Sequence, residues 1–166
     1  MSLFSGYVFI HACPKPLTQH VEWAISRVLG EVIRIDWIDQ PAQPGSLRGE
    51  IYWQAKSSIG LDFVAELQGW PTLIFEITQE TTVGLEGYRW AYSPSNGLFQ
   101  SRIDAAGNTL VTENQVRSAM QRAGKNALKL QRELDQLLGA AWDSELDQYR
   151  GAAEEQNQVW LHRVAN

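Results

Sequence analysis

The chain has 166 residues, of which 44% are hydrophobic and seven are Trp, so it can form a folded domain with a substantial core. Its formal net charge of −5 argues against non-specific nucleic-acid binding, because that activity requires a basic surface. A single Cys excludes an internal disulfide and suits a reducing cytoplasm. No apolar run reaches the roughly 18 residues that span a membrane. The N-terminal sequence does not read as a signal peptide. We therefore expect a cytoplasmic protein that does not bind a membrane.

Residues 1–80 alternate between strand and helix patterns. A β-branched and aromatic run at 7–11 predicts a strand, and the sequence from Pro16 to Gly30 predicts a helix with Thr18 as N-cap. Period-two alternation predicts strands at 32–37, 48–54 and 71–78, with a second helix at 57–69 between the last two. This order is the split β-α-β pattern of ferredoxin-like folds, so we predict an α+β protein with an antiparallel sheet and helices on one face.

Residues after 80 add a hairpin and helices to this core. Strands are predicted at 88–93 and 98–103 around an Asn-Gly turn, followed by a short strand at 109–111. Thr112 and Gln115 match a capping box that opens a helix to about Ala123, and a second helix is expected at 126–138. Asp143 can cap a last short helix that ends at Tyr149. We expect one domain over 1–166, divided into a core half (1–80), hairpin strands (81–111), a helical segment (112–150) and a terminal extended segment (156–166).

Alternation also predicts which side chains the helices cover and which they leave open. The apolar row is expected under the helices: Val8, Ile10, Ile33, Ile35, Trp37, Ile51, Trp53, Leu73, Phe75 and Ile77. The opposite face of the sheet then carries a mixed aromatic and charged set: Tyr7, Phe9, His11, Arg34, Asp36, Glu50, Tyr52, Ile74, Glu76 and Thr78.

Three residues near the N-terminus have the chemistry of a metal or nucleophile site. His11, Cys13 and His20 lie within ten positions of each other, yet no paired ligand spacing supports a zinc site. Cys13 near a helix N-terminus could be an activated thiolate, but nothing in the sequence marks an oxyanion hole or an orienting group. No glycine-rich phosphate loop is present. We therefore predict no catalytic set, no metal and no cofactor, with Cys13 and His20 in structural roles.

The open face of the sheet offers a better candidate for binding. His11, Arg34, Asp36, Glu50, Tyr52 and Glu76 form the predicted binding face, which could be solvent-exposed sheet, a dimer surface or the floor of a pocket. In a ferredoxin-like sheet His11 would lie near Glu50. RNA binding on this face is disfavoured, because its carboxylates would repel phosphate. The competing interpretation is a small enzyme that uses His11 with Glu50 or Glu76 as acid and base.

The charges in the C-terminal half are unevenly distributed. Residues 113–132 carry a net charge of +4 and residues 133–155 a net charge of −6. The simpler interpretation is two helices whose solvated faces complement each other. The alternative is a basic stripe that binds an acidic partner or, against the overall charge, nucleic acid: Arg122, Lys125, Lys129 and Arg132.

Several segments together resemble one known family. They are "HVEWAISRVLG", "DWIDQPAQPG", "LQGWPTLIFEIT", "SPSNGLFQ", "ELDQLLGAAWDSELDQYR" and "WLHRV", which span nearly the whole chain. The sequence is similar to an actinobacterial family of about 160–170 residues that is known only as a domain of unknown function. The resemblance implies a cytoplasmic actinobacterial protein built as one unit, and it transfers no activity, ligand or catalytic residue.

The sequence therefore favours a non-catalytic protein that binds a protein partner or a small ligand. A homodimer through sheet or helix surfaces is one form that such a partner could take. The acid–base enzyme and the nucleic-acid binder are the alternatives.

Overall fold

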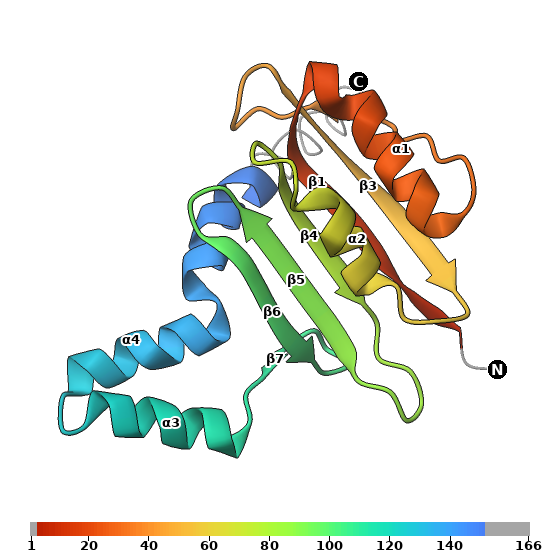
Figure 1. Ribbon diagram of the computed structural model, residues 1–166. Coiled ribbons are helices and arrows are strands. Elements are labelled where there is room, and N and C mark those ends of the chain that lie inside the picture. Colours follow the sequence, from red (N-terminus) through yellow and green to blue (C-terminus); the bar gives the residue numbers. More distant parts are fainter. Residues whose placement is uncertain (1–2, 152–166) are drawn as a thin grey trace, which may run out of the picture.

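The computed structural model describes residues 3–151 (Figure 1). The N-terminal part contains β1 (Phe4–Pro14), the 3-10 turn η1 (Lys15–Leu17), α1 (Thr18–Leu29), β2 (Ile38–Asp39), β3 (Ser46–Ala55), α2 (Gly60–Leu67) and β4 (Ile74–Gln79). The C-terminal part contains β5 (Gly87–Ser93), β6 (Gly97–Ile103), β7 (Thr109–Leu110), α3 (Glu113–Ala123) and α4 (Ala127–Leu138). Residues 140–151 form a further helix. The predicted α+β class is confirmed.

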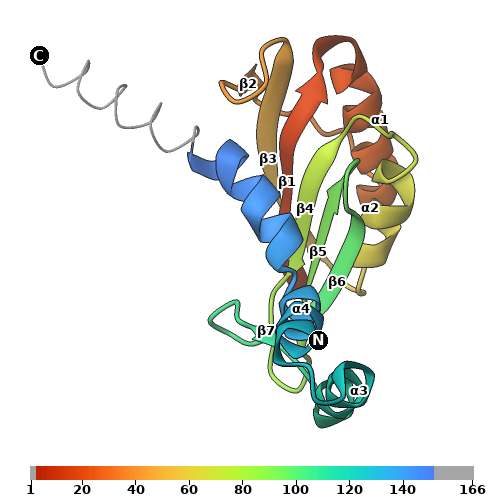
Figure 2. The same cartoon turned by 90° about the vertical axis from the view of Figure 1, so that its left-hand side faces the viewer.

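All seven strands belong to one antiparallel sheet. Their order is β2-β3-β1-β4-β5-β6-β7, so β1 lies between β3 and β4. The helices α1 and α2 pack on one face of this sheet, and helix 140–151 lies against the other (Figure 2). We call this second face, opposite α1 and α2, the open face.

The main core lies between the sheet and the two helices α1 and α2. It contains every member of the apolar row that alternation predicted, with Val8, Phe75 and Ile77 fully buried and Ile33, Trp37 and Ile51 partly buried. Trp90 of β5 is also buried in this core, with Tyr88 and Tyr92 packed against it. The aromatic residues of β5 therefore extend the core and do not line the open face.

The segment 32–37 differs from the prediction. Its alternation holds, because Ile35 is buried while Arg34 and Asp36 are exposed, but it is not a strand of the sheet. The backbone amides of Ile33 and Ile35 donate to side chains of α1, namely Ser26 Oγ and Glu22 Oε1, so they are not available for a strand ladder. The pairing with β3 begins only at Ile38.

The strand β1 also differs from the prediction. It runs from Phe4 to Pro14 rather than over 7–11, and a one-residue β-bulge interrupts its pairing after Ile10. The bulge resets the alternation, so both His11 and Ala12 lie on the open face, while Cys13 returns to the main core.

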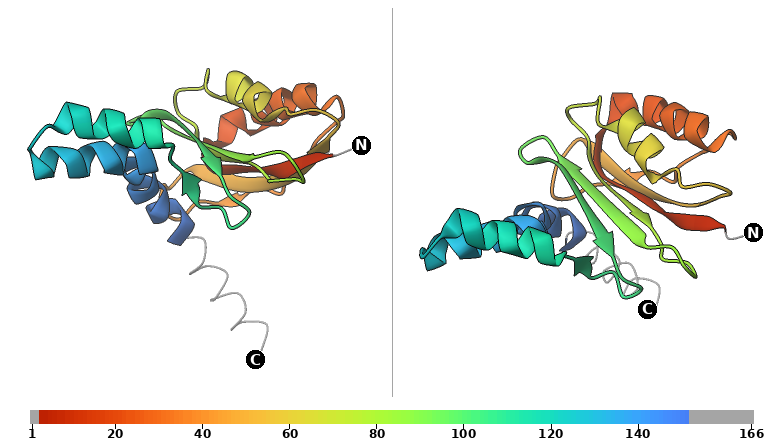
Figure 3. Two further views of the ribbon diagram at one scale, coloured as in Figure 1. Left: turned by 90° about the horizontal axis from the view of Figure 1, so that it is seen from below. Right: turned by 60° about the horizontal axis from the view of Figure 1, so that its bottom comes forward.

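The hairpin and helices after residue 80 match the sequence pattern closely. Thr112 Oγ1 accepts from the backbone of Gln115, and the Gln115 side chain accepts from the backbone of Thr112, so the predicted capping box forms. The helices α3 and α4 form an antiparallel hairpin, residues 113–138, that projects from the end of the sheet (Figure 3). We call this hairpin the arm.

The last described helix begins earlier than predicted. Gly139 ends α4 with a left-handed φ of 77°, and the next helix starts at residue 140, so Asp143 lies inside it and is not its cap. The predicted extended segment 156–166 lies outside the described residues. Among residues 3–151, no helix is both long enough and apolar enough to cross a membrane.

Candidate functional site

Helix 140–151 covers part of the open face. Its Leu146 is fully buried against Ala12, Ile74, Ala91 and Phe99 of four different strands. The side chains of Trp142 and Tyr149 pack at the border of this small cluster. The helix therefore forms a wall on the open face, next to the strand β1.

Polar contacts align this helix with the sheet. Trp142 Nε1 donates to the carbonyl of Gly97 at 2.9 Å. The carboxylate of Glu145 accepts hydrogen bonds from Ser93, Ser95 and Asn96 at the turn between β5 and β6. Burial raises the pKa of Glu145, but these hydrogen bonds outweigh it and the net pKa lies below the usual value. The start of the helix is thus tied to the β5–β6 turn by charge-assisted hydrogen bonds.

A buried ion network joins the other end of the helix to the centre of the sheet. Glu76 on β4 is only 8% exposed and accepts from His11 Nε2 at 2.7 Å, from Arg89 Nε at 3.0 Å and from Arg150 at 2.5 Å. Burial alone would raise the pKa of Glu76, but the hydrogen bond and charge of His11 and the charges of Arg150 and Arg89 lower it to about 2. Glu76 is therefore a permanent anion whose oxygens are already occupied.

Asp143 and Asp147 complete this network from the helix side. Asp143 binds Arg89 at 2.5 Å and Arg150 at 3.4 Å, and Asp147 binds Arg150 at 2.9 Å. Each arginine thus bridges Glu76 to a carboxylate of the helix, so both guanidinium groups are paired within the network.

The β-bulge places the imidazole of His11 in this network. The backbone carbonyl of His11 accepts a hydrogen bond from the side chain of Gln40, which is 2% exposed and lies just after β2. The ring stacks on Phe9, with 6.3 Å between centroids, and directs Nε2 to Glu76. A bulge next to a cavity commonly re-aims a side chain in this way.

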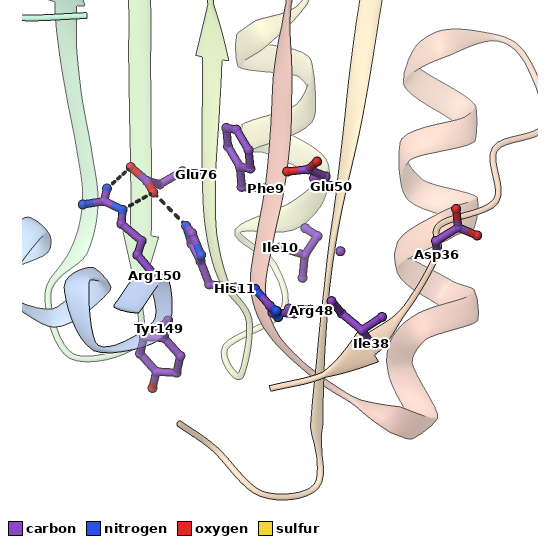
Figure 4. A pocket seen from close by; sticks show the side chains of 11 residues that line it. Phe9, Ile10, His11, Asp36, Ile38, Arg48, Glu50, Glu76, Tyr149 and Arg150 are labelled. Atoms are coloured by element: carbon purple, nitrogen blue, oxygen red, sulfur yellow. Dashed lines mark hydrogen bonds and ion pairs between the residues drawn. The ribbon is translucent and has the colours of Figure 1, made fainter. Parts of the chain in front are cut away.

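A cavity of about 770 Å³ lies beside His11 and Glu76 (Figure 4). Its floor comes from β1 and β3, and Tyr149 and Arg150 of helix 140–151 stand at its side. The lining combines aromatic, aliphatic and charged side chains: Phe9, Ile10, His11, Asp36, Ile38, Arg48, Gly49, Glu50, Glu76, Tyr149 and Arg150. Volumes of roughly 300–1,000 Å³ are usual for small-molecule sites.

The cavity is charged on its β3 side as well. Arg48 and Glu50 are two residues apart on β3, on either side of Gly49, which places them on the same face of the sheet. Burial lowers the pKa of Arg48, and the charge of Glu50 raises it in turn. A Cβ on Gly49 would collide with Ile35 of the main core, so the chain needs glycine between these two residues.

Four of the six residues predicted for the binding face line this cavity: His11, Asp36, Glu50 and Glu76. Arg34 does not, because its guanidinium binds Glu22 of α1 at 2.7 Å on the other side of the sheet. Tyr52 also lies outside the cavity, where it packs on Tyr7 and accepts from Gln54. The sequence predicts that His11 lies near Glu50. Both residues line the cavity, but the residue that binds His11 directly is Glu76.

The three residues of the possible metal or nucleophile site do not come together, because the sheet separates His11 from Cys13 and His20. Cys13 is fully buried in the main core, and burial raises the pKa of its thiol to about 12, which leaves it unreactive. His20 lies on the outer side of α1, against Trp23 and Trp70. In the part of the chain that the structure describes, no three His, Cys, Asp or Glu side chains are grouped to hold a metal.

The basic stripe lies on the arm, which projects from the sheet (Figure 3) and contributes no residue to the cavity lining. Arg122 pairs with Glu133 across the two helices at 2.7 Å, in agreement with the interpretation of complementary helix faces. Lys125, Lys129 and Arg132 are exposed and form no ion pair with any residue of 3–151.

Sequence reasoning missed Arg89, Arg150, Arg48 and Tyr149. Arg89 lies between two core residues of β5, Tyr88 and Trp90, and Arg48 lies two residues before Glu50 on β3, so alternation places both on the open face. Their proximity to Glu76 and the cavity follows only from the strand order. Arg150 and Tyr149 come from a helix whose position on the sheet depends on long-range packing. Such contacts leave no local signal in the sequence.

Comparison with known proteins agrees with the family resemblance. No curated protein and no solved structure matches the chain. A family model described as "Protein of unknown function (DUF3145)" matches residues 7–163, which is nearly the whole chain and includes every residue of the cavity lining. The chain therefore belongs to the DUF3145 family, whose own description assigns no function.

Proposed function

We propose that the protein is a non-catalytic binding protein that takes a small polar ligand in the cavity on the open face. The observation that carries this proposal is the composition of the lining. Phe9, Ile38 and Tyr149 offer apolar surface, and Arg48, Asp36 and Glu50 offer charges of both signs. Because six of the eleven lining residues are Asp, Glu, Arg or His, the ligand that suits this cavity is polar and carries charged groups, with an apolar part that packs on the aromatic and aliphatic side chains.

The state of Glu76 supports binding rather than acid–base chemistry. A carboxylate with a pKa of about 2 holds no proton to donate near neutral pH and is a weak base. Its hydrogen bonds join β1, β5 and helix 140–151, so Glu76 positions these elements relative to each other. The network fixes the shape of the cavity before a ligand arrives, and such pre-organisation favours affinity.

A cavity-filling substitution tests the proposal. Ile38 lines the cavity and is 48% exposed, so Ile38→Trp should fill it without disturbing the core. Val32→Trp, at a position that is 82% exposed and outside the cavity, is the matched control. A thermal-shift screen of amino acids, organic acids, nucleosides and sugars should find a compound that stabilises the wild type and Val32→Trp but not Ile38→Trp. If every stabilising compound acts equally on Ile38→Trp, or if none stabilises the wild type, the proposal is wrong.

The enzyme alternative has one observation in its favour. The carboxylate of Glu76 binds His11 Nε2 at 2.7 Å, and a carboxylate that orients an imidazole is a common arrangement in acid–base sites. If the compound found in the screen is chemically altered by the wild type and not by His11→Asn, the protein is an enzyme. Unaltered recovery of the compound supports binding alone.

We further propose a ferredoxin-like unit within the N-terminal half. The order β2-β3-β1-β4, with β1 antiparallel to both neighbours and both helices on one face, supports this assignment. The single-domain organisation, the cytoplasmic location and the actinobacterial origin are further parts of this proposal, and they rest on the composition and on the family resemblance.

A further inference from the structure

The carboxylates of the cavity lining differ in whether other residues already bind them. On the side of helix 140–151, the carboxylate of Glu76 is bound by Arg150, which also pairs with Asp147. On the side of β3, Asp36 and Glu50 are exposed and form no hydrogen bond or ion pair with any residue of 3–151 (Figure 4). The lining therefore offers two carboxylates to a ligand.

The charge of the lining has a preferred sign. Its carboxylates outnumber its arginines, with Asp36, Glu50 and Glu76 against Arg48 and Arg150. A cation that enters on the β3 side is attracted by Asp36 and Glu50, whereas an anion is repelled by both. The low-dielectric walls of a cavity strengthen such a field. The ligand that suits this side of the cavity therefore carries a positive charge.

The aromatic row of β1 limits how such a cation can be held. Phe9 lies between Tyr7 and His11, and both of these rings are nearly parallel to its own, at interplanar angles of 15° and 14°. The two faces of Phe9 are therefore turned toward its neighbours, and a ligand meets mainly the edge of the ring. A ring attracts a cation at its face, while its edge carries the positive end of the quadrupole. The positive charge must therefore be bound by the carboxylates, and the ring edge is left for an apolar group.

We infer that the ligand of this cavity is a small organic cation, a primary amine or a guanidinium compound, whose N–H groups donate to Glu50 and Asp36 and whose apolar part packs beside Ile38. The inference rests on the proposed function and adds to it the sign of the ligand's charge and the need for N–H donors. Hydrogen bonds from a charged N–H group to a carboxylate are among the strongest polar contacts in proteins. A quaternary ammonium compound has no N–H group and should bind less well.

Compounds that share a shape and differ in charge test the inference. The pairs are phenethylamine with hydrocinnamate, tryptamine with indolepropionate, and cadaverine with glutarate. Isothermal titration calorimetry of the wild type should detect binding of at least one of the amines. The matching acid should bind at least about tenfold more weakly, because Asp36 and Glu50 repel it. The trimethylammonium derivative of the same amine should also bind more weakly, because it cannot donate a hydrogen bond.

Neutral variants of the two carboxylates locate the bound cation. Glu50→Gln and Asp36→Asn should each weaken binding of the amine by about tenfold, because each removes the charge from one hydrogen-bond acceptor. The control, Glu31→Gln, removes the same charge from an exposed carboxylate outside the lining and should leave the affinity unchanged. All three side chains are exposed, so the variants should melt at the same temperature as the wild type.

The outcomes separate this inference from the proposed function. Binding of an amine that is weakened in Glu50→Gln and lost in the cavity-filling variant Ile38→Trp supports both. If the acids bind as well as the amines and Ile38→Trp still abolishes binding, the inference is overturned while the proposed function stands. Amine binding that all variants retain takes place elsewhere on the surface and overturns the inference. Failure of every amine to bind also overturns it, and the broader screen then decides the proposed function alone.

Discussion

At the residue scale, the main feature is the carboxylate of Glu76, which its hydrogen-bond and ion-pair partners keep charged although it is buried. Glu76 is buried, yet three cationic or polar side chains from β1, β5 and helix 140–151 bind its two oxygens. Removing one partner of a buried ion network is costly, because the remaining charges stay buried without compensation. Glu76 should therefore contribute to stability and to the position of the helix.

We expect Glu76→Gln to lower the free energy of unfolding by about 3 kcal/mol. The matched control is Glu66→Gln, which removes an exposed ion pair with Arg27 and should cost less than about 1 kcal/mol. Urea denaturation followed by tryptophan fluorescence measures both. Equal losses for the two variants would contradict a structural role for the buried network.

The same carboxylate predicts how stability changes in acid. Its pKa is about 2 in the folded protein, below the ordinary value of 4.5, so the stability that it contributes is fully present above 4.5. This contribution is lost as the pH falls from about 4.5 toward 2. The unfolding free energy of the wild type should therefore decline more steeply over this range than that of Glu76→Gln. Parallel declines in the two proteins would show that other groups dominate acid unfolding.

At the scale of the element, helix 140–151 depends on the turn that precedes it. Gly139 has a φ of 77°, and a Cβ at this position would lie 2.7 Å from the ring of Phe99. The chain must leave α4 here in a left-handed conformation and pass close to the sheet. This single glycine sets the direction in which the last helix crosses the open face.

We expect Gly139→Ala to destabilise the protein more than Gly107→Ala does. Both glycines have positive φ, but nothing lies within 4 Å of a Cβ at Gly107, so that substitution carries backbone strain alone. The difference between the two variants measures the close approach to Phe99, and we expect it to exceed about 1 kcal/mol in urea unfolding. If the two substitutions cost the same, the contact with Phe99 does not constrain the turn.

The same elements show what could be predicted from the sequence. The apolar row, the hairpin at 87–103 and the capping box at Thr112 follow from short-range periodicity and turn chemistry, and they are confirmed. The segment 32–37 has the alternation of a strand but is not one, because Ser26 and Glu22 of α1 accept the hydrogen bonds of its Ile33 and Ile35 amides. The candidate site was half predicted, since alternation identified His11 and Glu76, but only tertiary packing brings Arg150 to them.

At the scale of the whole molecule, the sheet carries two cores of unequal size. The large core lies under α1 and α2, and the small one lies under helix 140–151. The small core buries few apolar side chains, so ion pairs and polar contacts hold much of that helix in place. The two faces should therefore respond differently when the chain is shortened.

We expect a chain that ends after Gly139 to keep the large core but expose the small one. Phe99 and Ile74 would lose the cover of Leu146, and Glu76 would lose Arg150. Compared with a chain that ends after residue 151, it should bind a fluorescent apolar dye and melt several degrees lower, while its far-ultraviolet signal for the sheet persists. Identical melting of the two chains would mean that helix 140–151 contributes nothing to the sheet.

The β-bulge in β1 determines where a related chain can lose one residue from this strand and still fold. Elsewhere in β1, loss of one residue would shift the side chains beyond that point to the opposite face of the sheet, so core residues would face outward or open-face residues would face the core. Between Ile10 and Cys13 the opposite holds, because removal of one residue would restore regular alternation and leave both flanking side chains in the main core. The packing of the large core thus does not require the extra residue. A relative that is one residue shorter at this point could keep the large core while losing one partner of Glu76, so the presence of His11 would report on the buried ion network and the cavity rather than on the packing of that core.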